Sequence, residues 1–189
     1  MREERYFYPI TKIENSTSRK KAILVEPKEV IRVASLLPSS ISMRFLIGSA
    51  QHETNFALNE VDTEETGFQT FGLFQLSKDE AKEMGNPNAD LLDLYTSVRI
   101  FCRLMEKRLE SIIKAANLIA PYPNDIWAYL ALCHNQGKAA CLKTIKNYGL
   151  NWEAYKNRNP KLRIVSSRYG DDCITGGKYF LMLSPNEPL

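Results

Sequence analysis

The stretch that decides the fold is MRFLIGSAQHETNF, residues 43–56. Its apolar side chains recur at the spacing of a helix, and they are numerous enough to predict a helix that is largely buried. Glu53 is the exception, because a carboxylate inside an apolar helix is costly unless it is hydrogen-bonded or has a chemical role. The sequence therefore makes Glu53 a candidate catalytic residue.

Two short motifs follow this helix along the chain. The first is GLFQL at residues 72–76, and the second is CHNQG at residues 133–137. The amides of Gln75 and Asn135 can donate to, and accept from, sugar hydroxyl and acetamido groups. Asparagine and glycine also suit the left-handed backbone of tight turns, so turn structure alone is a second explanation. Both interpretations predict polar turns that could lie beside Glu53.

The remaining sequence predicts a mostly α domain. A helix is expected to begin at Pro27, and Ser77 followed by Glu80 has the pattern of a capping box at the start of another. Residues 90–119 have apolar side chains along one helical face, which predicts a long central helix. Residues 57–71 are polar and acidic and predict a loop, so we expect at most a small β element.

Length and composition favour one domain with a short arm. The chain has 189 residues, which suits a single domain, and we expect an N-terminal arm over 1–25 and one domain over 26–189. No segment approaches the roughly 18 apolar residues that a membrane helix needs, so no membrane partner is predicted. The first residues are charged and lack the apolar core of a secretory signal, so we expect synthesis without one.

Charge and cysteine content argue against several classes of function. The net charge is +3, and basic residues cluster only at 19–21, so no nucleic-acid partner is predicted. His52-Glu53 begins like the zinc-protease motif HExxH, but Phe56 occupies the position of the second histidine. The cysteines are Cys102, Cys133, Cys141 and Cys173. Their spacing fits no zinc site, so no metal or cofactor is predicted. Cytosolic synthesis favours free thiols, although an even number also permits two disulfides.

In combination these motifs resemble the lysozyme-like superfamily, and within it the soluble lytic transglycosylases and goose-type lysozymes. The family pattern is E-S-x-F, then G-L-M-Q, then A-Y-N-A-G, followed by a late tyrosine. This chain has E-T-N-F, G-L-F-Q and C-H-N-Q-G in the same order, with a long predicted helix before the last motif. The resemblance covers residues 41–140 and implies a mostly α, α+β lysozyme-like fold.

The resemblance implies that Glu53 is the general acid in cleavage of the β-1,4 bond between N-acetylmuramic acid and N-acetylglucosamine. Apolar neighbours would raise its pKa and keep it protonated, as a general acid at neutral pH requires. His134 replaces the family tyrosine that supports the catalytic carboxyl, which leaves the pH optimum open. Tyr169 is the preferred candidate for the late tyrosine, with Tyr179 as the alternative.

Seven further residues are expected to contact or support the substrate. They are Thr54, Thr66, Gln75, Tyr129, His134, Asn135 and Tyr169. Thr54 replaces the family serine and keeps its hydroxyl, and Thr66 is similar in placement to a family serine in the loop before the second motif. Tyr129 could stack on a sugar ring, but its helical spacing also suits a core residue.

The sequence leaves open how the cleavage is completed. In lytic transglycosylases one carboxylate suffices, because the C6 hydroxyl of the substrate closes a 1,6-anhydro ring. An inverting hydrolase needs a second carboxyl about 6.5–9.5 Å away. Candidates for this second carboxyl are Asp62, Glu64 and Glu65, although the same residues could form a solvated acidic loop.

The predicted partner is a peptidoglycan strand, and no oligomeric state is predicted. Without a secretion signal, we expect the protein to reach the cell wall on a phage particle, after lysis or by injection, and otherwise to remain cytoplasmic. Two alternatives stay open: an enzyme of the same superfamily that cleaves chitin or chitosan, and a glycan-binding module that has lost catalysis.

Overall fold

The computed structural model describes residues 22–158 and 164–177. Within these ranges it confirms a mostly helical fold with a small antiparallel sheet of three strands. Most of the predicted N-terminal arm, residues 1–21, lies outside the described residues. The part that is described lies along the segment after the second helix, where the Val25 N–H donates to the Phe56 carbonyl at 2.9 Å and Leu24 pairs with Ala57.

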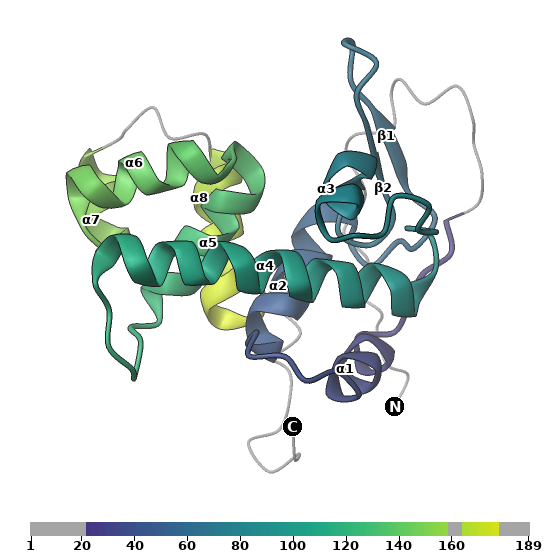
Figure 1. Cartoon of the computed structure of the whole chain (residues 1–189), viewed down its shortest axis with the longest axis horizontal. Helices are drawn as coiled ribbons and strands as arrows, with labels where there is room; N and C mark the ends of the chain where they lie inside the picture. Colours follow the sequence, from purple (N-terminus) through teal and green to yellow (C-terminus); the bar gives the residue numbers. More distant parts are fainter. Residues whose placement is uncertain (1–21, 159–163, 178–189) are drawn as a thin grey trace, which may run out of the picture.

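Figure 1 shows how the elements are arranged around one long helix, α4. The helices are α1 (Pro27–Ser35), α2 (Met43–Thr54), α3 (Lys78–Glu83), α4 (Leu94–Ala116), α5 (Asp125–Gln136), α6 (Lys138–Tyr148), α7 (Trp152–Arg158) and α8 (Ile164–Thr175). The strands are β1 (Val61–Thr63), β2 (Gln69–Phe71) and β3 (Leu76–Ser77), in the order β1-β2-β3. The long helix that the sequence predicts over 90–119 is therefore confirmed as α4. It crosses the molecule, with α5 to α8 gathered at one end and α1, α3 and the sheet at the other (Figure 1).

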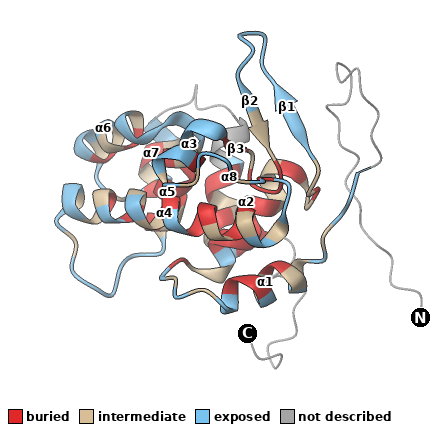
Figure 2. Ribbon diagram, turned by 45° about the vertical axis from the view of Figure 1, so that its right-hand side comes forward, coloured by how far each residue is buried: buried red, intermediate tan, exposed pale blue. Residues whose placement is uncertain are grey.

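α2 lies at the centre of the fold, as its apolar sequence predicts. Phe45, Ile47 and Ala50 are fully buried, and Figure 2 shows buried residues along α2. Gly48 allows α8 to approach, because a Cβ at this position would overlap the backbone carbonyl of Asp172. The helix ends at Asn55, which adopts the left-handed conformation with φ 51°. Glu53 is thereby fixed in the last turn of a buried helix.

The acidic segment 57–71 contains a β-hairpin where the sequence predicts a loop. Val61 pairs with Phe71 and Thr63 pairs with Gln69 across β1 and β2. All three residues of β1 are exposed, so the alternation of buried and exposed side chains that marks a strand in sequence is absent. In Figures 1 and 2 the hairpin projects from the helices into solvent.

β3 leads directly into α3, and the predicted capping box is confirmed at their junction. The Ser77 hydroxyl accepts from the Glu80 backbone N–H at 3.2 Å, and the Glu80 carboxylate accepts from the Ser77 N–H at 2.9 Å. The four cysteines are free and buried, as expected for reduced thiols. None of the helices in the described part of the chain is long and apolar enough to cross a membrane.

Candidate active site

Glu53 lies in the last turn of α2 with 17% of its side chain exposed. Burial raises its pKa from 4.5 to about 7. Interaction with Tyr169 lowers this pKa somewhat, and the negative charge of Glu80 raises it. The carboxyl is therefore protonated in a large fraction of molecules at neutral pH, and it still reaches solvent.

The GLFQ motif forms a tight turn beside this helix end. Gly72 has φ 70°, and a Cβ there would overlap the carbonyl of Leu91. Gln75 also adopts the left-handed conformation, with φ 49°. Its amide donates to the Gly72 carbonyl at 3.0 Å and accepts from the Thr70 hydroxyl at 2.7 Å. The Gln75 amide thus makes two hydrogen bonds within its own turn, and its binding to sugar stays a prediction.

Thr54 ties the turn to α2. Its hydroxyl donates to the Leu73 carbonyl at 3.1 Å, and the residue is 7% exposed. The Thr54 hydroxyl thus has a structural role in the interior, and its contact with substrate stays a prediction. Because Thr54 directly follows Glu53, this hydrogen bond also attaches the GLFQ turn to the residue next to Glu53.

An aromatic stack holds the turn against the long helix. The ring centroids of Phe74 and Phe101 are 4.0 Å apart, with an interplanar angle of 7°. The centroids of Phe45 and Phe101 are 5.9 Å apart, and these rings are also stacked. His134 contacts the edge of Phe101 at 5.3 Å. Such close ring contacts make the positions of Phe74 and His134 depend on α4.

His134 lies in the last turn of α5 with 5% of its side chain exposed. Its Nε2 lies 3.0 Å from the Phe74 carbonyl oxygen, and its Nδ1 lies 3.0 Å from a guanidinium nitrogen of Arg108. Nε2 is also 3.6 Å from Oε1 of Glu53, which is too long for a hydrogen bond. Burial lowers the pKa of His134 to about 4, and the nearby charges of Glu80 and Arg108 act in opposite directions.

The Nδ1 side of the His134 ring lies against an ion pair that the sequence did not predict. Arg108 donates to Oε1 of Glu80 at 2.6 Å, and this side-chain pair is only 12% and 19% exposed. Burial tends to raise the pKa of Glu80, but the charges and donors of His134, Ser77 and Arg108 hold it below its ordinary value. The sequence identified Glu80 only as a helix cap.

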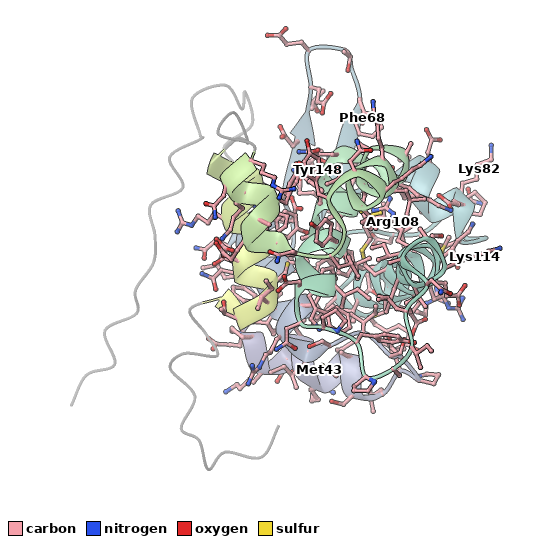
Figure 3. All side chains as sticks on the ribbon, turned by 90° about the vertical axis from the view of Figure 1, so that its left-hand side faces the viewer. Met43, Phe68, Lys82, Arg108, Lys114 and Tyr148 are labelled. Carbon is pink, nitrogen blue, oxygen red and sulfur yellow. The ribbon has the colours of Figure 1, made fainter. Side chains whose placement is uncertain are left out.

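A signal for Arg108 was present in the sequence. Leu104 and Ile112, four residues to either side, are buried, so Arg108 occupies the buried face of α4. Figure 3 shows Arg108 among the helices, whereas Lys82 and Lys114 point outward at the edge of the molecule. An arginine on an apolar helical stripe is the same kind of exception as a glutamate in an apolar helix.

Tyr169 on α8 completes the surroundings of Glu53. Its ring stacks on His52 at 4.3 Å and 9°, and it meets the edge of His134 at 6.3 Å. The residue is fully buried, and burial followed by the charge of Glu53 raises the pKa of its phenol well above the ordinary value. Its hydroxyl interacts with the Glu53 carboxyl but meets hydrogen-bond geometry with no described residue, so the two groups are close and imperfectly aligned. Tyr169 therefore supports the carboxyl from within the protein.

Three other predicted site residues lie in the core, in the turn of the hairpin and near the end of α5. Tyr129 is fully buried and its hydroxyl donates to the Asn151 carbonyl at 3.3 Å, so it is a core residue and cannot stack on sugar. Thr66 is exposed in the turn of the hairpin, where its hydroxyl accepts from the Phe68 N–H at 3.4 Å. Asn135 is exposed near the end of α5, beside His134 in sequence.

The candidate second carboxylates belong to the same hairpin. Asp62, Glu64 and Glu65 are all exposed, and the hairpin stands away from the helices in Figure 1. A hollow of about 220 Å³ lies between the hairpin and the start of α3, and another of about 310 Å³ lies near Asn86 and Arg99; Glu53 lines neither. Among the described residues, no three histidine, cysteine, aspartate or glutamate side chains come together as a metal site.

Comparison of the chain with models of known protein families, with curated proteins and with solved structures finds no match. The resemblance to lysozyme-like proteins therefore remains a prediction that rests on the three sequence motifs. The structure adds a partly buried carboxyl with a pKa of about 7 beside His134 and Tyr169, next in sequence to Thr54, which bonds to the second motif. Such a group can donate a proton to a leaving oxygen.

Proposed function

We propose that the protein cleaves the β-1,4 glycosidic bond between N-acetylmuramic acid and N-acetylglucosamine in peptidoglycan, with Glu53 as general acid and base. The observation that carries the proposal is the raised pKa of Glu53, about 7, at a carboxyl that keeps 17% of its side chain exposed. A carboxyl with an ordinary pKa would be almost fully ionised at neutral pH and could not serve as an acid.

The surroundings of Glu53 support this role. Thr54 and the GLFQ turn fix the backbone on one side, and His134 and Tyr169 cover the carboxyl from α5 and α8. These are also the positions at which the sequence resembles lytic transglycosylases. The agreement between a motif pattern and a perturbed carboxyl is the basis of the proposal, because fold alone does not define chemistry.

The proposed reaction uses one carboxylate. Glu53 gives its proton to the bridging oxygen as the bond to C1 of N-acetylmuramic acid breaks and positive charge builds on that ring. The resulting carboxylate then takes the proton of the C6 hydroxyl, whose oxygen bonds to C1 and closes a 1,6-anhydro ring. The exposed position of Asp62, Glu64 and Glu65 on the projecting hairpin favours this outcome over hydrolysis.

The test is digestion of purified sacculi, with the released muropeptides identified by mass. We expect anhydro-ended products from the wild type and at least a 100-fold slower release from Glu53→Gln, since a general acid contributes about 10²–10⁴-fold. Glu110→Gln, at an exposed position of α4, is the matched control and should retain full activity.

Other outcomes would change or remove the proposal. Reducing ends would assign hydrolysis and would show that a second group positions water. Turnover of chito-oligosaccharides without muropeptide release would reassign the substrate. A fully active Glu53→Gln variant would remove Glu53 from the mechanism.

A further inference from the structure

His134 is surrounded by ionisable groups from four other elements. Glu53 of α2 and Glu80 of α3 lie 3.6 Å and 4.0 Å from its ring nitrogens. Arg108 of α4 contacts Nδ1, and the Tyr169 ring of α8 meets its edge. Two carboxyl groups beside a histidine would favour its charged form, but burial lowers the pKa of His134 and the positive charge of Arg108 lowers it further.

The geometry defines which nitrogen of His134 carries the hydrogen. Arg108 can only donate, so Nδ1, 3.0 Å from its guanidinium, must accept. The Phe74 carbonyl can only accept, so Nε2, 3.0 Å from it, must carry the hydrogen. Both contacts hold together only in the neutral ring protonated at Nε2, because an imidazolium would place an N–H against the guanidinium.

We propose that the Glu80–Arg108 pair is a positioning device that holds His134 as the neutral Nε2–H tautomer beside Glu53. The inference rests on the proposed function in assigning Glu53 its chemistry, but the state of His134 can be observed without any substrate. Arg108 acts through His134, and Glu80 acts through Arg108. Neither residue touches the reacting atoms.

The consequence for Glu53 follows from distance. An imidazolium with its Nε2 only 3.6 Å from the carboxyl would lower the pKa of Glu53 by about 1–3 units, since opposite charges at this range stabilise the ionised form. A neutral ring has no such effect. By supplying a donor and a positive charge at Nδ1, Arg108 prevents this lowering and preserves the raised pKa that burial gives Glu53.

Glu80 determines where Arg108 points. Its Oε1 accepts from Arg108 at 2.6 Å, while Oε2 accepts from the Ser77 N–H at 2.9 Å and from the Ser77 hydroxyl at 3.1 Å. The same carboxylate therefore caps α3 and orients the guanidinium. Because Glu80 of α3 orients Arg108, and Arg108 contacts His134, a helix-capping residue can influence a histidine on α5.

The direct test is nitrogen NMR of the ¹⁵N-histidine-labelled full chain. Only two histidines are present, so a His52→Gln variant assigns the spectrum. We expect His134 to show hydrogen on Nε2, none on Nδ1, and no titration between about pH 8 and pH 5. Hydrogen on Nδ1, or titration near the ordinary histidine value, would overturn the proposal in the wild type, with no variant needed.

Two variants of Arg108 provide the second test. Arg108→Met removes the donor and the charge, so His134 should titrate at a higher pH and the alkaline limb of sacculus cleavage should move about 1–3 pH units down. Arg108→Lys keeps a donor and a charge and should restore the wild-type profile. The proposal would be contradicted if Arg108→Met is folded by circular dichroism but changes neither the His134 tautomer nor the pH profile of sacculus cleavage.

The two proposals fail in different ways. Absence of muropeptide release with the expected His134 spectrum would remove the proposed function and leave the positioning device standing. Release of anhydro-muropeptides with a titrating His134 would support the proposed function and remove the positioning device.

Discussion

At the scale of the residue, the main result is a carboxyl whose pKa is set by its surroundings. Burial of the Glu53 carboxyl is the largest cause of its raised pKa. Tyr169, which lowers this pKa, and the charge of Glu80, which raises it, each have a smaller effect than burial. The site is thus built chiefly by exclusion of water, with polar groups adjusting the result.

The pH dependence of activity follows from this pKa. Because a general acid must be protonated, cleavage should be fastest below pH 7 and kcat/KM should fall about tenfold for each unit above it. Initial rates of sacculus cleavage, measured across pH 4–9 at constant ionic strength, would show this alkaline limb. A limb centred near pH 4.5 would mean that Glu53 behaves as an ordinary exposed carboxyl.

The same pKa makes a prediction about stability. The folded-state value of about 7 lies above the unfolded value of 4.5, so the contribution of protonated Glu53 is complete below pH 4.5 and is lost as pH rises through 7. Glu53→Gln cannot ionise and should be more stable than the wild type by up to about 3 kcal/mol at pH 8, and equally stable at pH 4.

Urea unfolding at both pH values measures this difference. Glu110→Gln should match the wild type at both, since its side chain is on the exposed face of α4. A Glu53→Gln variant that is no more stable at pH 8 would show that the carboxyl is not destabilised by burial.

Sequence reasoning predicted residue types better than residue orientations. Apolar spacing predicted a buried helix around Glu53, whereas Tyr169 was a candidate only through the resemblance to a known family. The sequence did not predict that the Thr54 hydroxyl bonds inward to Leu73 or that the Gln75 amide closes its own turn. Those outcomes depend on which carbonyl lies nearest in three dimensions, which spacing along one chain does not contain.

At the scale of the element, the site depends on close packing of α2 against α8. Gly48 faces the backbone of Asp172 and Cys173, and no other residue fits without displacement. This contact brings Tyr169 to Glu53. A small residue in one helix thereby controls the chemistry of a carboxyl more than one turn away.

Gly48→Ala tests this dependence. The added methyl should push α8 outward, cost about 1–3 kcal/mol in stability, and reduce cleavage activity because Tyr169 moves away from Glu53. Gly149→Ala is a useful comparison, since a Cβ there meets nothing within 4 Å and only its φ of 70° is unfavourable. That variant should lose stability without losing activity, and a Gly48→Ala protein as stable as the wild type would refute the argument.

Elements with strong periodicity were predictable, and short exposed ones were not. The 23 residues of α4 carry a clear apolar stripe, whereas β1 has three residues that are all exposed. Hydrogen bonds to β2, and not burial, define β1 as a strand. The Glu80–Arg108 pair was missed for a related reason: it joins α3 to α4, and the spacing within each helix does not show which residue of the other helix lies opposite.

At the scale of the whole molecule, the described core is held by packing and hydrogen bonds without disulfides. The four cysteines come from α4, α5, α6 and α8, and all are free and buried. The Cys141 thiol donates to the Tyr129 carbonyl at 3.1 Å, and Cys173 lies 3.4 Å from the Ser49 hydroxyl. Each of these thiols therefore behaves as an interior packing group.

Thiol titration tests this account of the core. All four thiols are buried, so a reagent reaches them slowly in the folded protein. Burial also raises the pKa of Cys102 to about 11, which leaves that thiol with little thiolate. The folded protein should therefore show almost no reaction with a thiol-specific dye at pH 8, and four equivalents should appear when it unfolds in denaturant. Addition of a reductant should leave the melting temperature unchanged, because there is no disulfide to break. Fewer than four thiols in the unreduced, unfolded chain would show that two of the helices are covalently joined, and the stability of the fold would then depend on its redox environment.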